Sequence, residues 1–329
     1  MRTIDWVDGC PLIVDQTVLP DEVRFLSLST VDLLIDAIRR LAIRGAPALG
    51  VAGAMGVALA ARLGNELGID VDDAVRRIRA ARPTAVNLAW GVDRAAAYLP
   101  AGPAAVLAEA LTIRDAELAA SYEMGRRGAD LLQELAGDRI RVLTHCNTGG
   151  LATVEYGTAL AAVRSLHERG QLTDVLVSET RPLLQGARLT AWELRESGIA
   201  HRLVTDSAGP FLMVRGQVDA VVLGADRICA NGDVINKIGT YAHALGARAA
   251  GIPFVVVAPE STVDLETKSG TDVDIENRAG GEVLSFSGRR TAPLGTEALN
   301  PAFDVTPYPL VTAIVTESRV IRLDRGDLP

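Results

Sequence analysis

The sequence predicts an α/β protein, with a mainly helical N-terminal part followed by a parallel β-sheet that is covered by helices. Three observations predict this class. In the first third, apolar residues recur at the spacing of amphipathic helices. From residue 140 onward, short apolar runs typical of buried strands follow one another, and helical segments separate these runs. Strands that alternate with helices indicate βαβ units and hence a parallel sheet.

The helical part begins with an extended segment, in which residues 15–20 are expected to form a strand and a turn. Thr30 is a suitable N-cap for a helix that continues to about Leu41. After a loop at residues 44–47, an uncharged stretch rich in Ala and Gly predicts a buried helix, because it is short and weakly apolar for a membrane span. Further helices are expected over residues 71–80, 86–98 and 104–135.

The sheet is expected to follow the helical part, with a domain boundary between Ala120 and Gly137. We place the boundary so that the domains comprise residues 1–125 and 126–329. Parallel sheets bind ligands at the carboxyl ends of their strands, so the residues directly after each strand are the candidates for function. Strands are expected at residues 140–144, 174–178, 201–205, 218–223 and 252–258, and helices at residues 153–169, 187–197 and 237–250.

Composition narrows the possible functions. Hydrophobic residues make up 48% of the 329 residues, which excludes a disordered chain. Only 4% of the residues are aromatic, the net charge is −8 and no long basic run occurs, so neither a nucleic acid nor an anionic membrane is expected as a partner. Cys10, Cys146 and Cys229 are too widely spaced to predict disulfides or a zinc site, which favours a reducing cytoplasm. Residues 1–5 lack the features of a signal peptide.

Two residues that follow predicted strands are the candidate catalytic groups. Cys146 follows the first strand, and a helix start just after it would favour the thiolate. A small buried residue at a tight turn explains Cys146 equally well, and the neighbouring His145 is interpreted as a hydrogen-bonded structural side chain. Asp226 follows the fourth strand, where partial burial would make it a proton donor. Alone it is better explained as a turn residue, but its place opposite Cys146 on one sheet edge favours a function.

Several cationic residues are suited to an anionic ligand. Asn236 and Lys237 are expected to open a helix whose free backbone N–H groups would face an anion. Arg44 and Arg82 lie in loops beside Gly or Pro, which hold a guanidinium in one pose for bidentate phosphate contact. However, any single Lys or Arg more often lies solvated on the protein surface than in a binding site.

Polar residues also follow the second and third strands. Gln185 is suited to hydrogen-bond a sugar hydroxyl, although it also fits the cap of the next helix, and Asp206 is a second candidate carboxylate. Neither a Gly-x-Gly-x-x-Gly turn after the first strand nor a P-loop occurs, which disfavours a dinucleotide-dependent oxidoreductase.

Taken together, these segments resemble the methylthioribose-1-phosphate isomerases of the methionine salvage pathway. The resemblance covers nearly the whole chain, and its specificity comes from the number and order of the motifs. They are RTI at residues 2–4, DQT at 15–17, RGAPA at 44–48, RPTAVNL at 82–88, THCN at 144–147, ETRPLLQGARLT at 179–190, GADR at 224–227, NGD at 231–233, NKIGTY at 236–241 and NPAFDVTP at 300–307.

The resemblance implies a helical N-terminal domain, a Rossmann-like C-terminal domain and a homodimer. It further implies that Cys146 and Asp226 form the catalytic pair, which we expect to face a single closed cavity, and that no metal or organic cofactor takes part. The residues that carry over as substrate contacts are Arg44, Gly45, Ala46, Arg82, Gln185, Asn236 and Lys237.

Because the sequence departs from the family's usual motifs at several positions, the resemblance does not determine which group the sugar carries on C5. These positions include Thr148-Gly149-Gly150, Cys229 and Asn277. Alternative substrates are 5-deoxyribose 1-phosphate and ribose 1,5-bisphosphate. The same superfamily includes the regulatory subunits of the initiation-factor exchange complex, which are non-catalytic interaction proteins. The Cys–Asp pair, together with the Arg and Lys loops, favours an enzyme.

Overall fold

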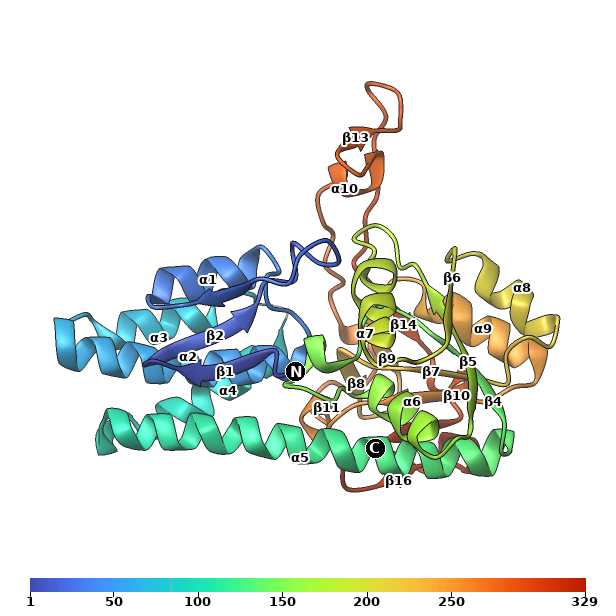
Figure 1. Cartoon of the computed structure of the whole chain (residues 1–329), viewed down its shortest axis with the longest axis horizontal. Coiled ribbons are helices and arrows are strands. Elements are labelled where there is room, and N and C mark those ends of the chain that lie inside the picture. The colour runs from blue at the N-terminus through green and yellow to red at the C-terminus, as the bar shows by residue number, and fades with distance from the viewer. Residues whose placement is uncertain (84) are drawn as a thin grey trace.

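The computed structural model describes residues 1–83 and 85–329, which form two lobes joined by the long helix α5 (Pro103–Ala136) (Figure 1). The first half of α5 contributes Val106 and Ile113 to the core of the N-terminal lobe. Its second half contributes Met124 and Leu132 to the core under the large sheet. A domain boundary after residue 125 would therefore lie inside a continuous helix, close to the point where one core gives way to the next.

The N-terminal lobe packs four helices beside a small antiparallel sheet. Residues 15–20, expected as a strand and a turn, form a turn only, because the Asp15 carboxylate accepts hydrogen bonds from both the N–H and the hydroxyl of Thr17. The strand before this turn ends at Val14, and the next strand begins only at Phe25. The elements are β1 (Ile4–Val7), β2 (Cys10–Val14), β3 (Phe25–Ser27), α1 (Val31–Arg39), α2 (Ala46–Leu67), α3 (Val71–Arg79) and α4 (Val86–Ala96).

Helix α2 is the centre of this lobe. Its length and composition would suffice to cross a membrane, but 89% of its most apolar window is buried inside the protein. Small residues allow α4 to lie directly against it: a Cβ atom on Gly91 would come within 2.0 Å of the Gly50 carbonyl oxygen. This close packing fixes the N-terminus of α2, which points toward the second lobe.

The second lobe is built on a seven-stranded sheet, and the predicted α/β class is confirmed. The five predicted strands are all present and parallel, as β4 (Ile140–Thr144), β5 (Leu172–Ser178), β6 (His201–Val204), β7 (Ala220–Leu223) and β10 (Phe254–Val257). The strand order is β16-β15-β10-β7-β4-β5-β6, with β15 (Ala313–Val315) parallel to β10 and β16 (Val320–Ile321) antiparallel at the edge.

Helices cover both faces of this sheet, as in a Rossmann-like fold. On one face, α5, α6 (Ala159–Glu168) and α7 (Ala191–Glu196) share a core with alternate strand residues such as Val142. On the other face, α8 (Ala208–Val214) and α9 (Thr240–Ala250) pack on the intervening residues, such as Leu143. Because successive strand residues point to opposite faces, both sides of each strand are apolar, which explains the apolar runs in the sequence.

A second, four-stranded sheet follows β7 and was not predicted. Its order is β11-β8-β9-β14, formed by β11 (Val263–Asp264), β8 (Arg227–Cys229), β9 (Val234–Lys237) and β14 (Phe303–Thr306). The expectation that Asn236 and Lys237 open a helix was therefore wrong. Both residues end β9, which pairs with the distant β14, and Gly239 turns the chain at φ +106° before α9 begins.

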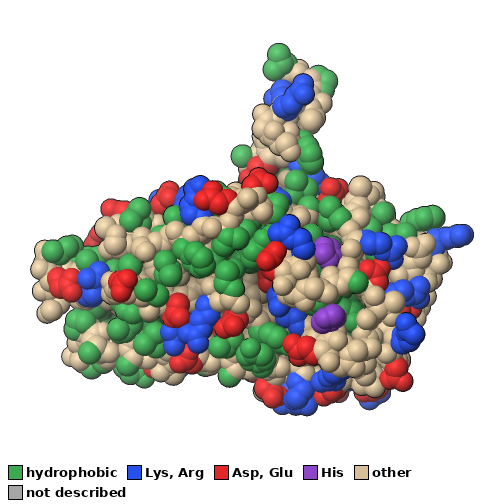
Figure 2. All heavy atoms as spheres, in the orientation of Figure 1, with side chains coloured by type: hydrophobic (Ala, Val, Ile, Leu, Met, Phe, Trp, Pro, Cys, Tyr) green, Lys and Arg blue, Asp and Glu red, His purple; other side chains and the backbone are tan. Residues whose placement is uncertain are grey.

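A narrow arm projects from the second lobe in Figure 1 and comprises α10 (Gly281–Leu284), β12 (Ser285–Phe286) and β13 (Arg289–Arg290). Over the face shown in Figure 2, Lys and Arg side chains are interspersed with Asp and Glu.

Candidate active site

Cys146 lies two residues after the end of β4, at the carboxyl edge of the sheet. Its backbone is left-handed, at φ +61°, and two threonines hold it there. The Cys146 N–H donates to Thr180 Oγ1 at 2.9 Å, and the Thr190 hydroxyl donates to the Cys146 carbonyl at 2.6 Å. The expected helix start beside Cys146 is absent from this described segment: a short 3₁₀ turn at Gly150–Ala152 follows, and α6 begins only at Ala159. The expected dipole of a helix that starts just after Cys146 is therefore missing.

The charge environment of Cys146 is set by side chains from three other segments. Burial raises the pKa of the Cys146 thiol, and the negative charge of Asp226 raises it further. The nearby cations of Arg44 and Lys237 lower this pKa in part. Since burial is the largest of these effects, the side chain is a neutral thiol near pH 7, able to donate a proton.

A small cavity of about 40 Å³ lies in front of Cys146, and its wall is strongly cationic. Four cations line it, from both lobes and from a late segment of the chain. Such a wall is suited to a dianionic group such as a phosphate. The lining residues are Leu41, Arg44, Gly45, Arg82, Cys146, Leu183, Gln185, Lys237 and Arg278.

Arg44 is buried and anchored to the loop that follows Cys146. Its Nη1 donates to the Asn147 carbonyl at 3.2 Å, and its Nη2 donates to the Asn147 side-chain oxygen. Its Nε has no partner in the described part of the chain. Burial lowers the pKa of the Arg44 guanidinium, although Cys146, Glu193 and Asp226 counteract this. One N–H of a fixed cation is thus left for a ligand.

The N-terminus of α2 completes this wall. Gly45 precedes the helix at φ +94°, and a Cβ atom there would lie 2.5 Å from the Ala152 carbonyl oxygen, so only glycine fits. Ala46 is the first residue of α2. The first N–H groups of a helix have no intrahelical partner and carry the positive end of its dipole, which favours an anion.

Lys237 lies at the end of β9. Its Nζ donates to the Ala302 carbonyl at 2.9 Å and lies 4.0 Å from the centre of the Phe303 ring. Burial lowers the pKa of this ammonium, while Cys146 and Asp226 raise it. The neighbouring Asn236 does not line the cavity: its amide donates to the Thr240 hydroxyl at 3.0 Å, which joins the end of β9 to the start of α9.

Gln185 and Asp206, both at the carboxyl edge, have different positions. Gln185 is buried and lines the cavity, and its side-chain oxygen accepts no hydrogen bond from any described residue. Asp206, the second candidate carboxylate, accepts the backbone N–H groups of Thr180 and Arg181, each at 2.7 Å. It therefore holds the loop after β5 and does not line either cavity described here.

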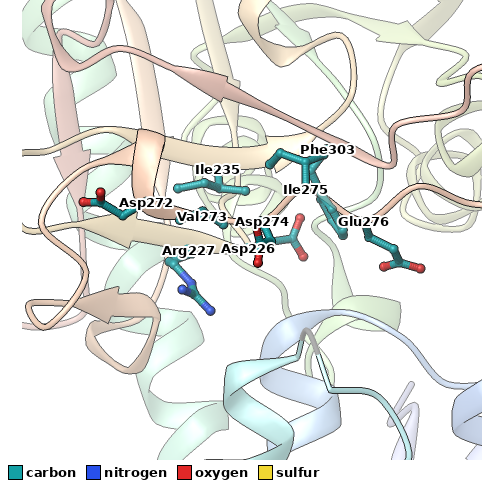
Figure 3. A pocket seen from close by; sticks show the side chains of 9 residues that line it. All are labelled: Asp226, Arg227, Ile235, Asp272, Val273, Asp274, Ile275, Glu276 and Phe303. Carbon is teal, nitrogen blue, oxygen red and sulfur yellow. The ribbon is translucent and has the colours of Figure 1, made fainter.

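Asp226 lines a second and larger cavity, of about 280 Å³ (Figure 3). Its backbone N–H donates to the Ile235 carbonyl at 2.9 Å, which fixes the start of β8 against β9. We expected Cys146 and Asp226 to face one closed cavity, but the structure places them in two neighbouring ones. The two cavities adjoin along β9, because Ile235 lines the second and Lys237, two residues later on the same strand face, lines the first.

Backbone strain is concentrated around the first cavity. Leu41 and Cys146, which line it, are left-handed, as are Thr180 and Leu184 in the loop after β5. For a β-branched residue such as Thr180 this conformation is a true outlier. Strain of this kind persists only where surrounding contacts enforce it, and it is typical of functional sites.

Some residues of the site were not predicted. Arg278 lines the first cavity and pairs with Glu282 at 2.6 Å, but it comes from an irregular late segment with no local motif. Glu193 accepts the N–H of Gly150 at 2.7 Å and the Asn147 amide at 2.8 Å, so it supports the loop that holds Arg44. Its position inside a helix gives no sequence signal of this role.

The structural interpretation of His145 is confirmed. Its Nε2 lies 2.8 Å from the Ile238 carbonyl, and burial lowers the pKa of the imidazole to about 4. Within residues 1–83 and 85–329 there is no group of three or more His, Cys, Asp or Glu side chains that would hold a metal ion. Thr84, in the predicted loop with Arg82, lies outside the described residues.

Comparison with known proteins places this site in context. The model of the initiation factor 2 subunit family matches residues 42–322. The chain is 57% identical, over 98% of its length, to a probable bifunctional methylthioribose-1-phosphate isomerase/methylthioribulose-1-phosphate dehydratase of Nocardia farcinica, but it spans only 60% of that protein. It is 54% identical to the methylthioribose-1-phosphate isomerase of an Anaeromyxobacter species, over 98% of this chain and 94% of that protein. A 5-deoxyribose 1-phosphate isomerase of Moorella thermoacetica is 48% identical, over 97% of this chain and 94% of that protein.

Two solved structures have the same architecture. The 5-methylthioribose 1-phosphate isomerase of Pyrococcus horikoshii superposes with a TM-score of 0.90 at 41% identity, covering 98% of this chain and 92% of that one. A structure described as the delta subunit of translation initiation factor eIF-2B from A. fulgidus gives a TM-score of 0.84 at 44% identity. The match covers 98% of this chain and 96% of that one.

Proposed function

Because the chain belongs to the initiation factor 2 subunit family, and within it to the methylthioribose-1-phosphate isomerases, we propose that it converts 5-methylthioribose 1-phosphate to 5-methylthioribulose 1-phosphate. It is an aldose–ketose isomerase, an intramolecular oxidoreductase of methionine salvage and so of methionine and amino-acid biosynthesis. The observation that carries this function is the cationic cavity beside the buried Cys146 thiol, with Asp226 in the adjoining cavity.

The first cavity would hold the 1-phosphate. Arg44, Arg82 and Lys237 supply positive charge, and the backbone N–H groups of Gly45 and Ala46 face the same anion from the start of α2. The free side-chain oxygen of Gln185 would accept a hydrogen bond from a sugar hydroxyl. Asn236 lies behind this wall and would act through Lys237 and Thr240. Because the cavity is buried, each of these contacts is stronger than it would be in water.

The reaction needs two proton or hydrogen movements. A phosphate on C1 blocks the spontaneous ring opening of a free sugar, so an acid must protonate the ring oxygen as its bond to C1 breaks. We assign this role to Asp226. Hydrogen must then move from C2 to C1, and we assign Cys146 to this step. In a direct hydride shift the neutral thiol shapes a dry wall, and the 2-hydroxyl proton passes to the Asp226 carboxylate that has protonated the ring oxygen. In an enediol route the thiol first gives its proton to that carboxylate; the thiolate then takes the proton from C2, delivers it to C1 and recovers the 2-hydroxyl proton. Both routes are redox-neutral overall.

Other substrates and roles follow from particular relatives. The 48% identity to a 5-deoxyribose 1-phosphate isomerase supports that sugar as a second substrate. Ribose 1,5-bisphosphate is a third candidate. The likeness to an initiation-factor subunit would support a non-catalytic regulatory role, but a scaffold has no need of a thiol and a carboxyl group beside a cationic cavity.

We also propose that the protein is a homodimer of the cytoplasm. The dimer is supported by the family membership, and a reducing compartment is supported by the three free cysteines. A mass measurement in solution tests the dimer, and a monomer at micromolar concentration would contradict it.

The function is tested by offering the purified protein three substrates and following ketose formation. These are 5-methylthioribose 1-phosphate, 5-deoxyribose 1-phosphate and ribose 1,5-bisphosphate. We expect rapid turnover of the methylthio sugar. Turnover of none of the three would refute the enzyme and favour the regulatory role.

A further inference from the structure

The mechanism proposed above leaves most of the second cavity unused. Only Asp226 was assigned a role there, yet the cavity of about 280 Å³ is much larger than the one that faces the phosphate. We propose that this cavity selects the substituent on C5 of the sugar by both polarity and charge. It would accept an uncharged apolar group and reject a second phosphate. This inference rests on the proposed function, because it uses the ring-opening role of Asp226.

The covalent structure of the substrate places its C5 group on this side. The ring oxygen is bonded to C1, which carries the phosphate, and to C4, which carries C5. An acid that protonates the ring oxygen therefore lies between the phosphate and the C5 substituent. Since Lys237 and Arg44 occupy the phosphate side, the cavity beyond Asp226 is the space left for C5 and its substituent.

One part of the cavity wall is apolar. Ile235 is buried in β9, and Phe303 lies on the neighbouring β14, where it pairs with Lys237. Val273 and Ile275 approach from the irregular segment after residue 272. Figure 3 shows these side chains around the carboxylates of Asp226 and Asp274. A methylthio group would remove apolar surface from water here, and the sulfur would contact the Phe303 ring favourably.

The remainder of the wall is acidic. Asp272 and Asp274 lie here beside Asp226, and the only cation among the lining residues described is Arg227. Glu276 also lines the cavity, but it pairs with Arg278 at 3.3 Å and with Arg82 at 4.0 Å, so the repulsive charge comes from Asp272 and Asp274. That guanidinium is already paired with Asp264 at 3.4 Å and donates to Thr267 at 3.3 Å. Asp274 makes no hydrogen bond or ion pair with any described residue, so its charge is not neutralised by a neighbour.

The two cavities therefore have opposite charge. A phosphate on C1 meets cations, whereas a phosphate on C5 would meet carboxylates at short range in a partly buried site, where like charges repel strongly. The same asymmetry also fixes the direction in which the substrate binds. Both 5-methylthioribose 1-phosphate and 5-deoxyribose 1-phosphate satisfy the charge requirement, and the longer apolar group gains more from the wall.

Two substitutions test the two parts of the wall separately, with kcat/KM measured for the three sugars. Asp274→Lys is expected to raise the value for ribose 1,5-bisphosphate, relative to the methylthio sugar, about tenfold or more. Ile275→Ser is expected to lower the value for the methylthio sugar, relative to the 5-deoxy sugar, by about tenfold. Matched controls are Glu266→Gln and Leu265→Ser, which are exposed residues outside the cavity and are expected to leave both ratios unchanged.

A binding measurement separates failure of this inference from failure of the proposed function. Calorimetry compares ribose 1-phosphate with ribose 1,5-bisphosphate on the unaltered protein and on Asp274→Lys, and it requires no turnover. We expect the unaltered protein to bind the monophosphate at least about tenfold more tightly, and the Asp274→Lys variant to reduce this preference. Equal binding of the two sugars by the unaltered protein, or ratios that neither substitution moves, would overturn the inference even if the isomerase is active.

Discussion

At the scale of single residues, burial and two neighbouring cations set the protonation of Cys146. Burial keeps Cys146 a thiol, while Lys237 and Arg44 limit how far its pKa rises. The same two cations are themselves destabilised by burial, and the negative charge of Asp226 offsets part of that cost. An anionic ligand would relieve the remaining repulsion between these cations, which is a physical reason for phosphate affinity.

The assignment of the catalytic pair predicts large losses of turnover. Asp226→Asn removes the acid and Cys146→Ala removes the thiol, so kcat is expected to fall at least about a hundredfold in each variant. Circular dichroism and Tm should show that the fold is intact. The matched control is Cys229→Ala, which removes a buried thiol outside both cavities and should leave kcat unchanged. Near-normal turnover in either active-site variant would refute that residue's role.

Glu193 illustrates a positioning residue. Its carboxylate is almost fully buried, accepts N–H groups of the loop after Cys146, and pairs with Arg164 at 3.1 Å. Glu193→Gln is expected to lower the free energy of unfolding by about 3 kcal/mol, because it leaves Arg164 and several N–H groups poorly paired. Urea denaturation measures this loss. Glu196→Gln, at an exposed position of the same helix, should change stability by less than about 0.5 kcal/mol.

At the scale of elements, the start of α2 is the most constrained part of the site. It brings Arg44, Gly45 and the first helical N–H groups to the second lobe, and the close packing of α2 on α4 holds it there. The loop after β5 is constrained in a similar way by Asp206 and by the left-handed Thr180. Both segments contribute lining residues to the first cavity.

Gly45→Ala tests this element. A methyl group there would overlap Ala152, and the left-handed backbone would add about 1–3 kcal/mol of strain. The start of α2 must therefore shift, and KM for the sugar phosphate is expected to rise at least about tenfold. Gly68→Ala, at the other end of the same helix, has φ +70° and open space around it. It should cost about 1 kcal/mol in stability and leave KM unchanged; a similar rise in KM for both variants would contradict the argument.

At the scale of the whole molecule, the two lobes meet at sites that neither builds alone. Besides the active site, a cavity of about 390 Å³ lies between them and is lined by Trp90 of α4, Glu117 of α5 and Glu317 of the second lobe. Burial, together with the charge of Glu317, raises the pKa of the Glu117 carboxyl to about 8. Asn87 of α4 donates to Ser261 of the second lobe at 3.0 Å nearby.

The raised pKa of Glu117 leads us to expect that the stability of the folded protein depends on pH. The pKa of Glu117 in the folded protein lies above its ordinary value of 4.5. As the pH rises, the unfolded state therefore loses this proton at a lower pH than the folded state does. The free energy of unfolding therefore falls as the pH rises from about 4.5 to about 8. Glu117→Gln removes this loss and is expected to raise Tm more at pH 8 than at pH 5. Glu123→Gln, exposed on the same helix, should show no such pH-dependent gain, and an equal effect of Glu117→Gln at both values would refute the prediction.

Local pattern sufficed to predict most of the elements. The five central strands and the helices of the first lobe lie close to their expected positions, because each depends on the polarity of a contiguous stretch. The four-stranded sheet escaped prediction because β14 joins β9 across more than sixty residues, and no local pattern encodes such a pairing. For the same reason Lys237 was expected in a helix.

The sequence by itself determined the fold class, the edge of the sheet where the candidate site lies, and the residue types that are suited to bind a phosphate and move a proton. These depend on strand order along the chain and on intrinsic chemistry. Only the tertiary structure decided that Arg278 joins the cationic wall, that Asp206 supports a loop, and that Cys146 and Asp226 line adjoining cavities of opposite charge. Those outcomes depend on contacts between segments that are far apart in the chain. Only tertiary packing sets the distances between such segments.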